Sequence, residues 1–257
     1  MIEQLRSKYK SQLKRDPDKE FAPEFIRTTD LERRLVDEYG FDAIRLIFED
    51  CSNALYPIGE LPNDCPWARI NGLDIPSAIE TVFAPIESEV PALVDVLRDR
   101  CSHLYTEEKD DGWALHYFLD MLLHDGRRYY HIYTGGFPNA DPQPNSCLIE
   151  FDWSIPPDLA TLYAVHDGFG PILGSKDITV MAKMMDPICK EQNVYPEDYR
   201  YVDLLEFHPD DCGNAQCFYR QDSGYTTVDW DLEIWEISGS QDLFGYLDER
   251  LSQLDEE

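Results

Sequence analysis

The sequence predicts an α+β protein in which a mixed or antiparallel sheet is flanked by helices and preceded by a helical N-terminal extension. Two observations of pattern and one of composition predict this class. Apolar residues recur at helical spacing in the first 70 residues and near the C-terminus, and they alternate in several short stretches after residue 128. Hydrophobic residues make up 43% of the chain and aromatic residues 12%, which is enough for a packed core.

Residues 1–70 are expected to form helices. One apolar stripe runs from Ile2 to Leu13 and a second from Leu31 to Tyr39, and Gly40 separates the second helix from a third over 41–48. A proline-rich stretch between Pro57 and Pro66 follows. We therefore expect a helical extension over 1–70 and an α+β domain over 71–257.

The middle of the chain predicts two helical segments and two strands. Residues 74–104 are expected to be helical with breaks at Pro85 and Pro91. A helix over Trp113–His124 would place His116, Asp120 and His124 on one polar stripe. The β-forming residues 128–134 predict a strand that stops at Gly135, and 146–153 predict a second strand.

Residues 154–168 predict a short helix with both ends marked. Ser154 stands where an N-cap is expected, and Pro156 and Pro157 fit a first helical turn. Gly168 is expected to adopt the left-handed conformation that ends a helix. The apolar face of this helix consists of Leu159, Leu162, Tyr163 and His166.

This helix resembles the signature helix of the SUKH superfamily, whose Smi/Knr-like fold serves mostly as an immunity protein in bacteria. The resemblance is clearest over 150–254, where the predicted order is a capped helix, several strands and a closing helix around 243–254. The strands are expected at 201–207, 216–220, 227–231 and 233–237. The residues that carry the structural signature are Pro156, Leu159, Tyr163, Gly168 and Trp230.

The resemblance implies a cytoplasmic, non-enzymatic immunity protein that neutralises a cognate toxin by occluding it. A regulatory or scaffolding protein of the Smi/Knr-like type is the alternative that the same resemblance implies. Seven cysteines, odd in number and scattered, are typical of a reducing compartment, and no apolar run is long enough to span a membrane. We therefore expect no membrane partner.

The charge of the chain points to a basic partner. Asp and Glu number 51 against 22 Lys and Arg, which gives a net charge of −29. Residues 151–257 hold 23 acidic and 6 basic side chains. Such a surface repels phosphate backbones, so nucleic acid is not the expected partner, whereas a basic nuclease-type toxin would be attracted. The competing explanation is that the acidity only keeps the protein soluble.

A partner-binding surface is expected on the last strand. Over 228–234 the apolar residues alternate with Asp229, Asp231 and Glu233, which places three carboxylates in a row on the face opposite Trp230. The hypothesis adds the nearby acidic residues Asp210, Asp211 and Asp222. A solvated strand face and a divalent-cation site at Asp229 and Asp231 remain alternatives.

The sequence contains no motif for a phosphate-binding loop, a nucleophile elbow or a zinc-protease helix. The one group suited to bind a transition metal is His116, Asp120 and His124. Three ligands one turn apart on a single helix rarely converge on one ion, so a metal-dependent enzyme is the less favoured hypothesis. We therefore predict no catalytic residue, no cofactor and no metal.

Overall fold

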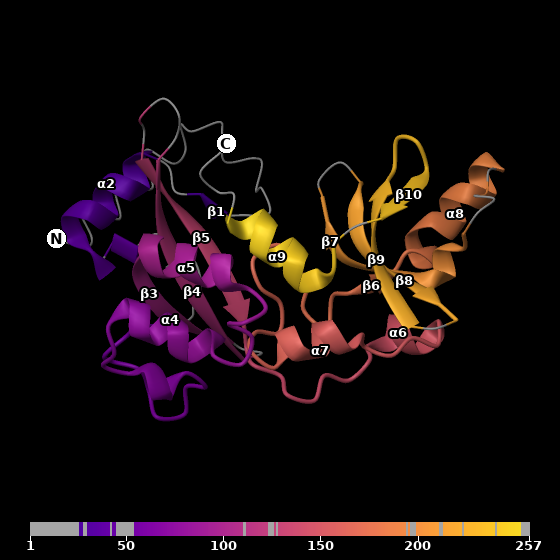
Figure 1. The fold of residues 1–257 in the computed structure, drawn as a ribbon. Coiled ribbons are helices and arrows are strands. Elements are labelled where there is room, and N and C mark those ends of the chain that lie inside the picture. Colours follow the sequence, from indigo (N-terminus) through magenta and orange to yellow (C-terminus); the bar gives the residue numbers. More distant parts are fainter. Residues whose placement is uncertain are drawn as a thin grey trace.

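In the described residues the chain forms two five-stranded antiparallel sheets, each flanked by helices (Figure 1). This arrangement confirms the predicted α+β class. The structure is a computed structural model, and the residues that it describes are 26–27, 30–41, 43–44, 54–109, 112–122, 126, 128–193, 195, 199–210, 213–222, 224–239 and 241–252.

The first sheet lies in the N-terminal half of the chain and is covered on both faces. Alternate side chains of its strands point to opposite faces of the sheet. On one face, Phe118 and Ile132 pack with Leu35 of α2 (Asp30–Tyr39). On the other face, Tyr117 and Tyr133 belong to the main core. Helices α4 (Ile75–Phe83) and α5 (Pro91–Arg100) cover that second face. The strand order is β1 (Ile26–Arg27), β5 (Arg128–Gly136), β4 (Gly112–Leu122), β3 (Cys101–Lys109) and β2 (Ala54–Pro57).

The predicted helical extension contributes strands as well as a helix. Helix α2 confirms the second apolar stripe, and Gly40 follows it with a φ of +56°. Strands β1 and β2 pair with β5 and β3, so part of 1–70 is built into the first sheet. The first apolar stripe, Ile2 to Leu13, lies outside the described residues.

The helical segment 74–104 is broken at Pro85 and Pro91, as predicted, because α4 ends at Phe83 and α5 begins at Pro91. Asp74 caps α4 by accepting the N–H of Ser77 at 2.8 Å, and Pro91 occupies the first turn of α5. The segment is not helical to residue 104, however, because α5 ends at Arg100 and strand β3 starts at Cys101.

Two predictions in the middle of the chain were wrong. Residues Trp113–Leu122 are strand β4 rather than a helix, and most of them are buried because helices cover both faces of the sheet. Residues 146–150 form the short helix α6 (Ser146–Glu150) rather than a strand, because the Asn145 side chain accepts the N–H groups of Cys147 and Leu148. The strand predicted at 128–134 is confirmed as β5.

The helix predicted over 154–168 is α7 (Pro157–Tyr163), shorter than predicted. Leu159 and Tyr163 are buried as expected, but Pro156 occupies the N-cap position, and Ser154 instead hydrogen-bonds the Tyr225 hydroxyl at 3.1 Å. Gly168 has the expected left-handed conformation, with a φ of +87°. It lies in the turn after the helix and is not its C-cap, which is Ala164.

The second sheet is built from the C-terminal half of the chain. Trp230, on the strand next to one edge of this sheet, is 1% exposed and packs edge-on against Tyr199 and Tyr201. Helix α8 (Ala182–Gln192) contacts the short helical turn η3 (Tyr201–Asp203) that carries Tyr201. The strand order is β10 (Glu236–Gly239), β9 (Gly224–Asp231), β8 (Ala215–Gln221), β7 (Leu204–Pro209) and β6 (Thr179–Val180). The closing helix is confirmed as α9 (Leu243–Ser252).

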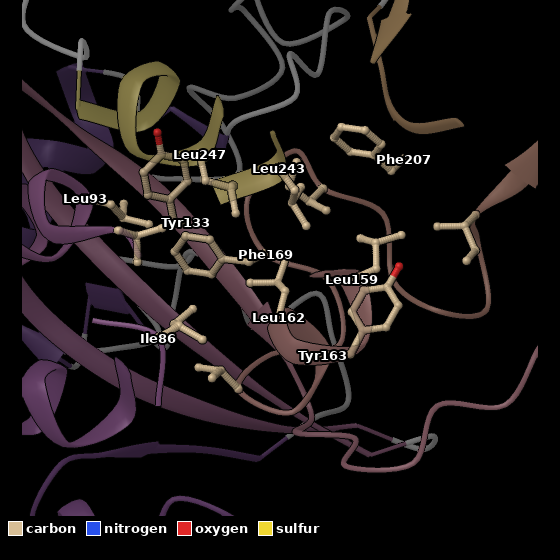
Figure 2. Close-up of a cluster of buried hydrophobic side chains, with 14 of the residues drawn as sticks. Ile86, Leu93, Tyr133, Leu159, Leu162, Tyr163, Phe169, Phe207, Leu243 and Leu247 are labelled. Atoms are coloured by element: carbon tan, nitrogen blue, oxygen red, sulfur yellow. The ribbon is translucent and has the colours of Figure 1, made fainter. Parts of the chain in front are cut away.

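One hydrophobic core joins the two sheets. Helices α7 and α9 lie between them, and their side chains meet those of both sheets (Figure 2). Asp248 of α9 also accepts the N–H of Leu93 at 2.8 Å, which caps α5 from the far end of the chain. The side chains that Figure 2 labels at this junction are Ile86, Leu93, Tyr133, Leu159, Leu162, Tyr163, Phe169, Phe207, Leu243 and Leu247.

Candidate interaction surface

The acidic surface predicted from the sequence lies on the hairpin of β9 and β10, with a shape that differs from the prediction. Strand β9 ends at Asp231, and residues 232–235 form the turn. The Asp231 side chain accepts the N–H groups of Glu233 at 2.8 Å and Ile234 at 3.3 Å, so it closes this turn. Glu233 is therefore not in a strand row with Asp229, and Ile234 is 60% exposed rather than buried.

In the pairing of β9 with β10, Glu236 occupies the position on the acidic face that was predicted for Glu233. Asp231 lies directly opposite Glu236, and Asp229 lies opposite Ser238. Residues directly opposite in an antiparallel pair point to the same face with Cβ atoms about 5 Å apart. Asp229, Asp231 and Glu236, called here the hairpin carboxylates, thus share one face. Glu236 is the second acidic residue in the stretch Glu-Ile-Trp-Glu-Ile, residues 233–237. The residue of β9 that lies opposite Glu236 cannot be derived from this stretch alone, because the pairing depends on the turn.

The remaining predicted residues divide between the two ends of the sheet. Asp210 lies near the hairpin carboxylates, because its neighbour Asn214 accepts the N–H of Leu232, which follows β9. Its carboxylate is engaged locally by the N–H and the amide group of Asn214. Asp222 is exposed in the turn between β8 and β9, at the opposite end of β9. The predicted six-residue surface is therefore wrong at Asp222, and Asp211 lies outside the described residues.

Two arginines of the second half of the chain, Arg200 and Arg220, bind groups away from the hairpin. Arg200 and Arg220 both bind Asp203, with N–O distances of 2.6 Å and 3.2 Å. Arg220 also donates to the Asp152 carbonyl at 2.7 Å and lies 4.6 Å from the centre of the Trp153 ring. Within the described part of the chain, the hairpin carboxylates form no ion pair with Lys or Arg. Asp229 accepts a hydrogen bond from the Gln216 amide, and Asp231 accepts the backbone N–H groups of its turn.

The face that carries these carboxylates is covered at its other end by α9. The Thr227 hydroxyl donates to the carbonyl of Gln241, and the Tyr246 hydroxyl hydrogen-bonds Nδ1 of His208. His208 and Tyr246 were not predicted as part of any site. His208 pairs with Gln216, which pairs with Asp229, so His208 and Asp229 share one cross-strand row. Asp231 and Glu236 lie further along, toward the turn between β9 and β10.

The metal hypothesis for His116 and Asp120 was based on a helix that does not form. On strand β4 these two residues are about 13 Å apart, at about 3.3 Å per residue. Asp120 pairs with Arg128, and His124 lies outside the described residues. Among the residues that the structure describes, no group of three His, Cys, Asp or Glu side chains is placed to hold a metal ion.

His116 instead belongs to a buried polar cluster on the first sheet. Its Nε2 lies 3.0 Å from a carboxylate oxygen of Glu107, its Nδ1 lies 2.9 Å from the Thr134 hydroxyl, and its ring stacks on Tyr105. Burial lowers the pKa of His116, and the Glu107 carboxylate opposes this shift. Both ring nitrogens of this buried imidazole therefore have protein partners.

His166 is a fully buried structural histidine, as its place on an apolar stripe predicted. The Gly136 carbonyl can only accept, so Nδ1 donates to it at 3.2 Å, and Nε2 accepts from the Tyr117 hydroxyl at 2.8 Å. The rings of Trp67, Phe83 and Phe169 surround it. Burial lowers the pKa of His166 to about 4, so the imidazole is neutral.

No protein-family model, curated protein or solved structure matches this chain. In the described residues no helix is long and apolar enough to cross a membrane.

Proposed function

We propose that this chain is a cytoplasmic binding protein of the immunity type, which neutralises a basic, nuclease-type protein toxin by covering its cationic active groove. The observation that carries the proposal is the placement of Asp231 directly opposite Glu236, with Asp229 on the same face. The SUKH resemblance of 150–254 supports the same class of function.

The physical argument starts from repulsion within the free protein. Like charges directly opposite on neighbouring strands destabilise a hairpin. A partner that brings Lys or Arg to this face relieves the repulsion and gains charge-assisted hydrogen bonds. The net charge of −29 also raises the rate of encounter with a basic protein. Occlusion then needs only shape and charge complementarity, and no reacting group on this chain.

The experiment co-expresses the chain in bacteria with the toxic domain encoded by the neighbouring gene and measures growth. Association of the two purified proteins is followed by stopped flow at low and at physiological salt. We expect restored growth and an association rate that falls by about tenfold between the two salt concentrations, because screening removes the steering.

Two matched triple variants test the surface. Asp229→Asn, Asp231→Asn and Glu236→Gln remove the hairpin carboxylates, and each new side chain keeps an acceptor oxygen for the turn. Glu150→Gln, Glu191→Gln and Asp222→Asn remove the same charge from exposed positions elsewhere. The first variant is expected to slow association about tenfold and the second only slightly. Growth arrest despite the parent chain, or equal effects of the two variants, would contradict the proposal.

A further inference from the structure

Strand β10 ends the second sheet and has one unpaired edge. Its four residues pair with β9 on one side, from Glu236 opposite Asp231 to Gly239 opposite Val228. On its other side, no backbone group of the described residues bonds to it. In an antiparallel edge strand, alternate residues direct their N–H and C=O groups outward. The edge therefore presents backbone donors and acceptors that can pair with another chain.

The side chains around this edge leave it accessible. Glu236, Ser238 and Gly239 are exposed, and only Ile237 packs partly against the core. At the turn that leads into β10, Ile234 is 60% exposed and adds an apolar contact point next to the acidic face.

The charge of the face decides which kind of chain can occupy the edge. A second copy of this protein would place its own hairpin carboxylates against those of the first, and like charges across a strand pair are unfavourable. A segment rich in Lys or Arg meets the opposite sign. The Glu236 carboxylate lies on the edge strand itself, and Asp231 lies one strand further in, within reach of a long cationic side chain.

We propose that the free edge of β10 binds an extended segment of the basic partner as a sixth strand of the second sheet. The proposal rests on the proposed function and specifies how the partner is held. Backbone hydrogen bonds to β10 supply affinity, and alternate Lys or Arg side chains of the added strand lie over the hairpin carboxylates. The side chains that alternate with these Lys or Arg residues point to the opposite face of the sheet and contact it at its edge.

The test uses the full chain and three synthetic peptides of about eight residues that alternate Lys and Val. One peptide is unmodified, and the other two carry N-methyl groups on one or the other alternate set of backbone amides. N-methylation removes donors from one edge of the peptide without changing its charge. Binding is measured by calorimetry, and amide hydrogen exchange of the chain is followed by NMR.

We expect the unmodified peptide to bind and to slow exchange of alternate amides over 236–239, while the amides of β9 keep their protection. One of the two methylated peptides should bind at least about tenfold more weakly than the other, because only one edge of the added strand faces β10. Equal affinity of both methylated peptides, or no slowing of exchange in β10, would overturn the edge proposal. Growth rescue that still depends on the hairpin carboxylates would then show that the proposed function holds without strand addition.

Discussion

Acidification is expected to destabilise the fold through His166. The imidazole is completely buried, it donates to the Gly136 carbonyl and it accepts from the Tyr117 hydroxyl, so both nitrogens are used by the neutral form. Protonation would place a second donor against the Tyr117 hydroxyl inside an aromatic cage. The folded state therefore resists the proton that the unfolded chain accepts freely.

The sign and size of the effect follow from the pKa shift. Burial lowers the pKa of His166 from 6.5 to about 4. A lowered histidine pKa leaves the stability intact above the unfolded value and removes it as the pH falls toward the folded value. The full shift corresponds to about 3 kcal/mol, and the part lost between about pH 7.5 and about pH 5 is about 2 kcal/mol.

The assay is urea unfolding of the parent and of a His166→Gln variant at several pH values. Glutamine can accept from Tyr117 and donate to Gly136 but does not titrate, so shifts of other groups cancel in the difference between the two proteins. The variant is expected to be less stable at neutral pH because it packs less well among Trp67, Phe83 and Phe169. Its disadvantage should shrink by about 2 kcal/mol by about pH 5. A difference that is constant with pH would refute the reasoning.

The other predictions concern stability at neutral pH. Tyr163→Ala and Trp230→Ala should each lower the free energy of unfolding by about 3–5 kcal/mol in chemical denaturation, because both side chains are buried in the core; an unchanged midpoint in either would contradict the packing described above. Asp248→Ala should cost about 1 kcal/mol because it uncaps the Leu93 N–H at the start of α5, whereas Asp248→Asn, which keeps the acceptor, should cost less.

Strand β9 could be predicted because one of its faces differs from the other. Val228 and Trp230 are buried while Asp229 is partly exposed, and this contrast fixes both the element and its orientation. Strand β4 lacks the contrast. Its residues from Ala114 to Leu119 are all buried, because helices cover both faces of the first sheet, and a continuous apolar run does not distinguish a strand from a helix.

The errors at the candidate surface have a local cause, which is the chemistry of single side chains. Alternation alone continued β9 through Glu233, but the Asp231 carboxylate accepts two backbone N–H groups and turns the chain. Asn145 does the same for α6, where a strand was expected. Hydrogen bonds from side chains to nearby backbone groups compete with strand formation. The spacing of apolar residues in the sequence does not reveal these hydrogen bonds. Glu236 could be placed opposite Asp231 only once the turn was known.

The division of one sheet face into a covered and an acidic part explains where charge is tolerated in this fold. Phe207 and Phe218 pack against each other at 4.8 Å between ring centres, and Phe207 also meets Tyr246 of α9, so this part of the face is apolar and covered. The Tyr246 hydroxyl also hydrogen-bonds Nδ1 of His208 and so joins α9 to strand β7. Carboxylates placed under α9 would lose their hydration without gaining a cation, at a cost of several kcal/mol each. Toward the turn between β9 and β10, Asp229 and Asp231 on the same face are partly exposed and Glu236 is exposed. Charge is thus tolerated on this face where its side chains keep contact with water, at the end next to the turn between β9 and β10.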